Sequence, residues 1–320
     1  MKKILVVGAA GFIGSAVAKK LTLQGNQVIG IDDFNDAMYP HALKEDRVTQ
    51  LFKGLDIPIH RVDIRNKEAL EQIIIPLKPD KICHLAARAG VRNSLLHPEE
   101  YEQVNVQGTI HMLEIARKLS VENMVIASSS SVYGNNTKIP FSENDRVDHP
   151  ISPYAATKKM NELISYTYHH LYGLPVTNLR FFTVYGPWGR PDMAMYKFSD
   201  LIRQKKPIEI YNFGNMRRDF TFIDDIVSGI IAALEKNLPY EIINLGNNHP
   251  EELLRVIDLI ENGLHMKAIR KMLPMQPGDV PETFADISKA KSLLGYKPET
   301  NIESGIKQFI DWYASYYHLN

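Results

Sequence analysis

The sequence predicts an α/β protein built around a doubly wound, parallel β-sheet. Short runs rich in Val, Ile and Leu alternate with helix-length amphipathic segments through the first half of the chain. The apolar runs lack the polar–apolar alternation of a half-exposed sheet, so we expect helices on both faces of the sheet. Regular alternation of strands and helices is typical of parallel βαβ units.

The periodic segments give the expected order of elements. Strands are expected over residues 3–8, 27–32, 58–63, 81–86, 123–128 and 175–181, with helices near 12–24, 66–77, 98–119 and 153–172. Past residue 185 the pattern breaks, and "YGPWGRPDMA" and "NFGNMRRDF" are expected to be loops. A helix near 224–236 and a strand over 241–246 then resume the pattern. We therefore predict a large domain over 1–180, completed by about 224–246, and a smaller, mostly α C-terminal lobe over 181–320.

The composition argues against several classes of partner. The 37 basic and 37 acidic residues cancel, which disfavours a nucleic-acid-binding surface or a polybasic membrane patch. The single cysteine, Cys83, stands in an apolar run, where a core thiol is expected and no intramolecular disulfide can form. The apolar N-terminal run is too short for a signal segment, and no run of 18 apolar residues follows. We expect a cytoplasmic protein with no nucleic-acid or membrane partner and no bound metal.

A glycine-rich turn directly follows the first expected strand. In "GAAGFIG", Gly8, Gly11 and Gly14 lie where that strand gives way to a helix. Glycines allow a tight turn and a close approach to a pyrophosphate, whose charge is stabilised by the helix N-terminus. The spacing differs from the commonest dinucleotide fingerprint, in which the first two glycines are two residues apart. We assign the turn, including Phe12 and Ile13, to a cofactor site.

An acidic residue at the end of the second strand supports this assignment. Asp32 is placed to accept hydrogen bonds from the ribose hydroxyls of a dinucleotide, as in the Rossmann fold. Asp33 follows, and no Arg or Lys appears before Lys44. A ribose 2′-phosphate would be repelled there, so the sequence favours NAD over NADP. Ile64 and Ala86, at the ends of the third and fourth strands, are assigned to the same site.

Asp63 ends the third expected strand and allows two interpretations. Its carboxylate could reach the adenine amine, or it could cap the helix that follows. The spacing alone favours neither interpretation.

The helix expected at 153–172 begins with a pattern suited to proton transfer. Ser152 is a candidate N-cap and Pro153 occupies the first helical position. Tyr154 and Lys158 are four residues apart and share one helix face. Tyrosine is a poor base at its ordinary pKa of about 10. A nearby ammonium group and a positive nicotinamide ring would lower that pKa. A first-turn aromatic beside a solvated lysine is the structural alternative, but the glycine turn and the hydroxyls of "SSSSVYG" favour catalysis.

These motifs together resemble the extended short-chain dehydrogenase/reductase family. They comprise the glycine turn, "SSSSVYG", Tyr154-x-x-x-Lys158, "RRDFTFIDDIV" and "PGDVPETFAD", in the family order. Within the family the chain is similar to the nucleotide-sugar 4-epimerases. The resemblance implies a bound NAD that oxidises the sugar C4 hydroxyl to a ketone and returns hydride to the opposite face. It also implies a homodimer formed through the helices at 98–119 and 153–172.

The resemblance implies a role for each matched residue. Tyr154 would be the base and acid at the sugar O4, Ser129 would hydrogen-bond O4, and Ser131 would be the second hydroxyl there. Lys158 would hold the nicotinamide ribose, and Asn105 would support the cofactor side. The remaining matched residues, Arg218 and Asp279, would contact the pyrophosphate and the nucleotide ribose. Gln276 stands where the family often has an arginine.

Two local stretches narrow the expected reaction. Dehydratases and decarboxylases of the family place acids just before Val-Tyr-Gly, where this chain has Ser130 and Ser131. The absence of these acids favours simple C4 epimerisation. "LRFFTVYGPWGRPDMA" and "AARAGVRNS", which contains Arg92, resemble the UDP-glucuronate 4-epimerases, although Arg88 replaces their usual glutamine.

By that resemblance, Thr183 and Arg190 would bind the sugar carboxylate, and Arg92 would belong to the substrate site. The expected reaction is conversion of UDP-glucuronate to UDP-galacturonate. A 4-epimerase of UDP-glucose, UDP-galactose or an N-acetylhexosamine is the first alternative. A noncatalytic NAD-binding protein is the second.

Overall fold

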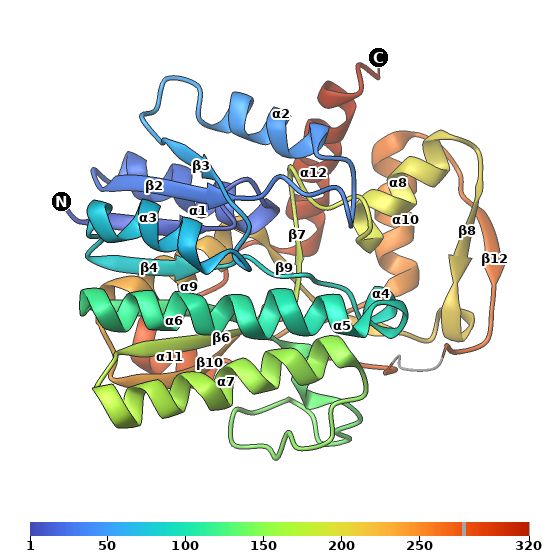
Figure 1. Cartoon of the computed structure of the whole chain (residues 1–320). Coiled ribbons are helices and arrows are strands. Elements are labelled where there is room, and N and C mark those ends of the chain that lie inside the picture. The colour runs from blue at the N-terminus through green and yellow to red at the C-terminus, as the bar shows by residue number, and fades with distance from the viewer. Residues whose placement is uncertain (277–279, 320) are drawn as a thin grey trace.

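The computed structural model describes residues 1–276 and 280–319 and contains a seven-stranded parallel sheet (Figure 1). Its strand order is β3-β2-β1-β4-β5-β6-β10. The strands span β1 Lys3–Val7, β2 Gln27–Asp32, β3 Ile59–Arg61, β4 Lys81–His84, β5 Asn123–Ser129, β6 Val176–Phe181 and β10 Tyr240–Leu245. Since the order reverses between β1 and β4, a crevice opens there at the carboxyl ends of the strands. The predicted fold class is confirmed.

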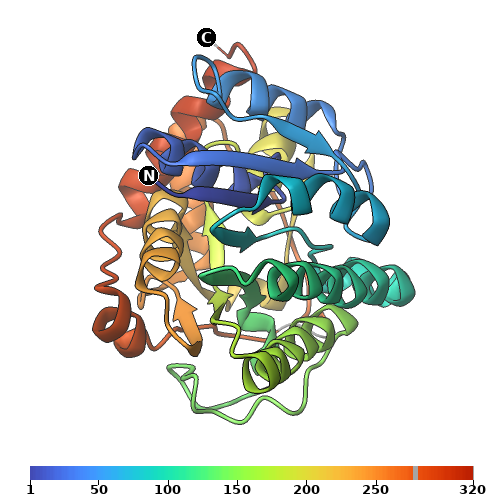
Figure 2. The ribbon, with the colours of Figure 1, turned by 60° about the vertical axis from the view of Figure 1, so that its left-hand side comes forward.

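Helices cover both faces of this sheet (Figures 1 and 2). One layer contains α3 Lys67–Leu77, α6 Gly108–Leu119 and α7 Pro153–Tyr172, and the other contains α1 Phe12–Leu23, α9 Ile223–Lys236 and α11 Ser288–Leu294. Each layer has its own apolar core against the sheet. The non-alternating strands are therefore buried on both sides, as their composition predicts.

Three segments differ from the sequence-based expectation. The helix expected at 98–119 is divided into α5 Pro98–Tyr101, a π-helical turn Glu102–Gln107 and α6. The stretch after the second strand contains an unexpected helix, α2 Ala42–Leu51, which lies beside the C-terminal helix in Figure 1. α4 Val91–Leu96 follows β4 and was also not expected.

The expectation that all of "NFGNMRRDF" is a loop is wrong for its second half. β9 Arg217–Phe222 forms a three-stranded sheet with β7 Thr183–Tyr185 and β11 Pro250–Glu252. The residues of β9 are buried from Asp219 onward. Because the strand begins with two arginines, its sequence does not indicate that most of it is buried. The first half of the stretch is a tight turn at Tyr211–Gly214, in which Asn212 and Phe213 each have a φ of 50°.

The C-terminal lobe is mainly helical, with α8 Ala194–Arg203, α10 Leu253–Leu264 and α12 Ile302–Tyr316. It also contains a two-stranded parallel sheet formed by β8 Pro207–Ile210 and β12 Ile269–Met272. α9 and β10 return to the main sheet, where β10 pairs with β6. The division into domains at residue 180 stays a prediction. In the described part of the chain, no helix has the length and apolar character needed to cross a bilayer.

A buried ion pair joins α7 to the strands beneath it. Glu162 on α7 accepts two hydrogen bonds from Arg180 on β6, at 2.8 Å from Nε and 2.9 Å from NH2, and each side chain is only 1% exposed. Ser128 on β5 donates a third, at 2.7 Å. Burial alone would raise the pKa of Glu162, but the Arg180 guanidinium outweighs burial and holds that pKa below its usual 4.5. The pair therefore fixes α7 against both β5 and β6.

Replacing Glu162 with alanine should leave the Arg180 charge buried and unpaired. We expect Glu162→Ala to lower the free energy of unfolding by about 3–5 kcal/mol, measured by urea denaturation. The apolar double variant E162L/R180M should recover most of this loss. Because the folded pKa of Glu162 is depressed, the wild-type advantage is present above the usual pKa of 4.5 that the unfolded chain has. It should be lost as pH falls through the folded pKa.

Asp311→Ala is the matched control, since it removes an exposed pair with Lys307. An exposed pair contributes about 0–1 kcal/mol. An equally small effect of Glu162→Ala would contradict a structural role for the buried pair.

Candidate active site

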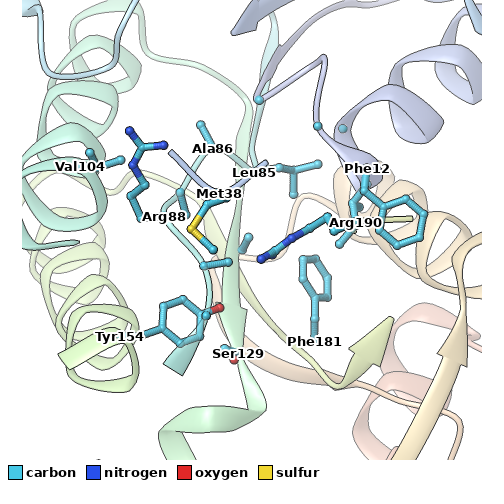
Figure 3. A pocket seen from close by; sticks show the side chains of 18 of the residues that line it. Phe12, Met38, Leu85, Ala86, Arg88, Val104, Ser129, Tyr154, Phe181 and Arg190 are labelled. Atoms are coloured by element: carbon cyan, nitrogen blue, oxygen red, sulfur yellow. The ribbon is translucent and has the colours of Figure 1, made fainter. Parts of the chain in front are cut away.

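A cavity of about 400 Å³ opens at the carboxyl ends of the parallel strands (Figure 3). The glycine turn after β1 lies on one side, and the end of β5 and the start of α7 lie on another. The cavity is lined by eleven of the twelve residues assigned to the cofactor and by four of the six described residues assigned to the substrate. These residues are Gly8, Gly11, Phe12, Ile13, Gly14, Asp32, Asp63, Ile64, Ala86, Tyr154 and Lys158, and Ser129, Ser131, Thr183 and Arg190.

The glycine turn brings the N-terminus of α1 close against β1 and β4. Gly8 has a φ of 92°, and a Cβ there would lie 2.8 Å from the backbone nitrogen of Ala86. A Cβ on Gly14 would lie 2.0 Å from the carbonyl oxygen of Gly8. Side chains are therefore excluded at both positions by backbone atoms. The turn leaves the α1 N-terminus facing the cavity, in the arrangement that suits a pyrophosphate.

Asp32 is buried at the end of β2 and organises the adjoining loop. Its Oδ2 accepts a hydrogen bond from Ala10 N at 3.1 Å, and its Oδ1 accepts one from Phe34 N at 2.8 Å. The ammonium of Lys44 on α2 lies 3.3 Å from Asp32 Oδ1 and 3.6 Å from Asp33 Oδ1. Lys44, the first Lys or Arg after Asp32 in the sequence, is thus returned to the end of β2 by α2. Two carboxylates against one ammonium still leave a net negative charge, which disfavours a 2′-phosphate.

The structure excludes one interpretation of Asp63. The N-cap of α3 is Asn66, whose side chain accepts a hydrogen bond from Ala69 N at 3.1 Å. Asp63 instead pairs with Arg65, at 2.6 Å between Oδ2 and NH2. Burial raises its pKa, but Arg65 outweighs burial and the net shift is downward, so the carboxylate is ionised at neutral pH. Asp63 lines the cavity, and a contact with adenine stays a prediction.

Asn105 does not line the cavity but supports two elements that do. It is fully buried in the π-helical turn, and its Oδ1 accepts a hydrogen bond from Arg88 N at 2.7 Å. Its Nδ2 donates to Arg88 O and to Thr157 Oγ1, each at 3.0 Å. The side chain thus connects the loop after β4 to the first turns of α7. This geometry is compatible with support of the cofactor side.

The hydroxyl groups at the end of β5 face Tyr154. Ser129 Oγ donates to Ser131 Oγ at 3.1 Å and accepts from Ser131 N at the same distance. Tyr154 is placed by the expected cap, since Ser152 Oγ accepts a hydrogen bond from Ala155 N at 3.1 Å and Pro153 begins the helix. Figure 3 shows the Tyr154 hydroxyl directed toward Ser129. A sugar hydroxyl in this space would meet both groups.

Burial governs the ionisation of both α7 side chains. It raises the pKa of Tyr154 above 10, against lowering by a hydrogen bond with Ser129 and by the charge of Arg190. Burial also lowers the pKa of Lys158 to about 8, and Lys158 Nζ donates to Ala127 O at 2.8 Å. In the protein alone, the pKa of Tyr154 is thus raised overall. Lowering of that pKa by Lys158 together with a nicotinamide ring stays a prediction.

Arg190 points into the cavity from the loop before α8 (Figure 3). Its side chain is 20% exposed and pairs with Asp192, at 3.0 Å from Nε to Oδ1 and 2.5 Å from NH2 to Oδ2. Thr183, at the start of β7, lines the same space. One guanidinium edge is thus fixed by Asp192, and NH1 lies outside that ion pair.

Two of the predicted substrate residues, Arg92 and Arg218, are not among the described residues that line this cavity. Arg92 is exposed and lies over the ring of Tyr211, 4.9 Å from its centroid. Arg218 donates hydrogen bonds to Arg217 O at 2.9 Å and to Pro281 O at 3.0 Å. Asp279 lies outside the described residues. The predicted contacts of these three with the nucleotide stay predictions.

Sequence reasoning missed several cavity residues. Met38 and Tyr39 come from a segment without periodicity, and Met193 precedes α8. Arg88, noted only as a departure from the family pattern, also lines the cavity, with its side chain paired to Glu100 at 2.8 Å. The carboxylates among the described lining residues are Asp32, Asp33 and Asp63, at the ends of β2 and β3. The described residues contain no cluster suited to a metal ion.

The chain is similar to several known proteins over nearly its whole length. The family model described as GDP-mannose 4,6 dehydratase matches residues 5–309. The chain is 46% identical to "Protein CapI" of Staphylococcus aureus, over 98% of this chain and 99% of that protein. It is 47% identical to a UDP-glucuronate 4-epimerase of Thermodesulfobacterium geofontis, over 96% and 95%.

A solved structure is similar over the whole fold. The UDP-glucuronic acid 4-epimerase of Bacillus cereus, in complex with UDP-glucuronic acid and NAD, superposes with a TM-score of 0.90. It shares 36% identity with this chain, and the match covers 98% of this chain and 100% of that one.

The glycine turn yields a direct test of the cofactor site. Gly14→Ala should abolish NAD binding in a calorimetric titration, because its Cβ would collide with the backbone of Gly8. It should also lower the free energy of unfolding by about 3 kcal/mol or more. Gly54→Ala is the matched control, with a φ of 76° and no neighbouring atom within 4 Å. It should cost about 1–2 kcal/mol and leave NAD affinity unchanged. Normal NAD affinity in Gly14→Ala would place the cofactor elsewhere.

Proposed function

The chain belongs to the family of the GDP-mannose 4,6-dehydratase model, and from that premise we propose that it is an NAD-dependent UDP-glucuronate 4-epimerase. It interconverts UDP-glucuronate and UDP-galacturonate. One observation carries this proposal. Arg190, Tyr154 and the Ser129 hydroxyl converge on the cavity that also contains the glycine turn, and the described lining has its carboxylates at the ends of other strands.

The residues around the glycine turn fit NAD. Backbone atoms leave no room for side chains at Gly8 and Gly14, beside the α1 N-terminus. Asp32 lines the same cavity, where its carboxylate can accept hydrogen bonds from the ribose hydroxyls. The related structure from Bacillus cereus contains NAD, which supports the same cofactor here. When bound, NAD accepts hydride from the sugar C4 and returns it to the opposite face.

Tyr154 and Ser129 provide the acid–base chemistry at O4. The Ser129 hydroxyl holds O4 beside the phenol, and Tyr154 removes the O4 proton as C4 is oxidised. Tyr154 returns that proton when C4 is reduced. Because burial raises the pKa of Tyr154, forming the phenolate depends on the Ser129 hydrogen bond and on positive charge. Lys158 uses one N–H on Ala127 O, which leaves two for the nicotinamide ribose.

Arg190 supplies the specificity for a carboxylated sugar. A guanidinium binds a carboxylate with two parallel hydrogen bonds, which a lysine would not reproduce. Asp192 occupies the Nε edge, so the sugar carboxylate would meet the other edge, formed by NH1 and the second N–H of NH2. Oxidation at C4 makes a β-keto acid that loses CO₂ readily when its C5–C6 bond aligns with the carbonyl. A clamped carboxylate keeps its charge and cannot rotate freely into that alignment.

The proposal is tested by incubating the protein with NAD and UDP-glucuronate and separating the products. We expect UDP-galacturonate at equilibrium with its substrate. Tyr154→Phe should reduce the rate at least about 10²-fold, the usual contribution of a positioned acid–base group. Arg190→Ala should reduce it about 10-fold to 10²-fold through the lost charged hydrogen bonds.

Tyr172→Phe, at the far end of α7, is the matched control and should leave the rate unchanged. UDP-pentose as the product would mean decarboxylation instead of epimerisation. Turnover of UDP-glucose but not of UDP-glucuronate would instead support the neutral-sugar alternative.

We also propose that the protein is a homodimer through α6 and α7. The two helices lie side by side on the outside of the molecule (Figures 1 and 2). α7 exposes a group of large apolar side chains, Met160, Leu163, Tyr166, Leu171 and Tyr172, between 41% and 66% exposed. Such a patch on a helix surface is typical of a protein interface.

Sedimentation velocity tests the dimer. Leu163→Glu should shift the protein from dimer to monomer, because it introduces a carboxylate at the centre of the apolar patch. Leu23→Glu is the matched control, since Leu23 is similarly exposed but ends α1 in the opposite helix layer. A wild-type protein that sediments as a monomer would refute the proposal.

A further inference from the structure

Arg47, on α2, is a completely buried arginine with an unusual set of partners. In residues 1–276 and 280–319 it makes no ion pair with a carboxylate, although its side chain is 0% exposed. A charge taken out of water in this way is retained only where other polar groups compensate it. Its function in the fold therefore depends on which groups those are.

The compensating groups come from two distant parts of the chain. Arg47 NH1 donates to Ala10 O, within the glycine turn, at 3.2 Å, and to the Tyr39 hydroxyl at 3.0 Å. Nε donates to Trp188 O at 2.9 Å, and NH2 donates to Gly189 O at 3.2 Å. Four of the five guanidinium N–H groups are thus used. One side chain joins the cofactor turn to the backbone just before Arg190.

The loop that Arg47 holds has a backbone that needs support. Trp188 has a φ of 65°, in the left-handed region that residues with a side chain rarely adopt. The Arg47 Nε–H group bonds to the carbonyl of this same residue. The Trp188 ring packs on Trp312 and Tyr316 of α12, with centroids 5.2 and 5.3 Å apart. The loop is therefore held in two ways: α12 packs against the Trp188 side chain, and Arg47 bonds to the Trp188 backbone carbonyl.

We propose that Arg47 is a positioning residue that sets the specificity for a carboxylated sugar by placing Arg190. The inference rests on the proposed function, in which Arg190 binds the sugar carboxylate. Arg47 fixes the carbonyl of Gly189, directly before Arg190, at a set position relative to the turn that holds the cofactor. Lysine cannot take this role, because its compact ammonium has three donors and cannot span carbonyls on both loops.

The test measures how much the sugar carboxylate contributes to binding. Calorimetry gives the Kd values of UDP-glucuronate and UDP-glucose, which differ in the carboxylate, and of UDP alone. All proteins carry Tyr154→Phe, which prevents turnover, and are saturated with NAD. The quantity of interest is the ratio of the UDP-glucose Kd to the UDP-glucuronate Kd.

We expect Arg47→Lys to lower this ratio about tenfold, through a misplaced charged hydrogen bond, while the Kd of UDP changes less than about twofold. Arg190→Ala removes the proposed carboxylate contact and so gives the minimum ratio. If Arg47 acts only through Arg190, the double variant R47K/R190A should have the same ratio as Arg190→Ala. Arg203→Lys is the matched control. Arg203 contacts Tyr313 and the Tyr317 ring, away from the loop before Arg190, so the Arg203→Lys variant should have the same ratio as the Tyr154→Phe parent.

The outcomes distinguish failure of the proposed function from failure of the proposed role of Arg47. A ratio near one in the parent protein would refute the proposed function, and this inference with it. A parent ratio well above one that R47K leaves unchanged would refute the role of Arg47 alone. If R47K fails to fold, Tyr39→Phe removes one of the four acceptors and should lower the ratio in the same direction by a smaller factor. An unchanged ratio there would equally refute the inference.

Discussion

The close contact between the start of α1 and the end of β1 is the constraint on which the site depends. With only backbone between them, Gly14 packs against the Gly8 carbonyl, and Gly8 packs against the loop after β4. Any side chain at these positions would push α1 away from the sheet. The contact places a helix N-terminus at the point where the strand order reverses, between β1 and β4. Every other group of the site is positioned relative to that point.

The chemistry at the other side of the cavity depends on how α7 sits on the sheet. Lys158 bonds to Ala127 O, and Glu162, one turn later, bonds to Ser128 and to Arg180. These contacts fall on the two β5 residues just before Ser129. The contacts of α7 with β5 therefore fix the distance between the Tyr154 phenol and the Ser129 hydroxyl. A charged pair suits this purpose because its geometry is directional, whereas apolar packing tolerates sliding.

Local patterns and motifs predicted the parts of the molecule that depend on near neighbours in sequence. The strands, the Ser152 cap and the shared face of Tyr154 and Lys158 follow from periodicity and spacing. Lys44 and Arg47 were not predictable in this way, because Lys44 pairs with Asp32, 12 residues away, and Arg47 binds two carbonyls about 140 residues away along the chain. α2 is a short and largely polar helix, so its sequence gives no sign that it packs between the cofactor turn and α12. The same applies to β9, whose leading arginines conceal buried residues.

The distribution of charge along the cavity also determines how a UDP-sugar and NAD can lie in it. The lining carboxylates Asp32, Asp33 and Asp63 gather at the ends of β2 and β3, where Lys44 and Arg65 only partly balance them. An acidic sugar would be repelled there, whereas an uncharged adenosine offers hydroxyl and amine donors to carboxylates. Arg190 provides the opposite charge on the side of Tyr154. Electrostatic complementarity therefore favours one arrangement, with adenosine at the acidic end and the sugar acid beside Tyr154. The buried Arg47 donates hydrogen bonds both to Ala10 O in the glycine turn and to Gly189 O beside Arg190. In the proposed arrangement, the position of Arg190 therefore depends on the glycine turn.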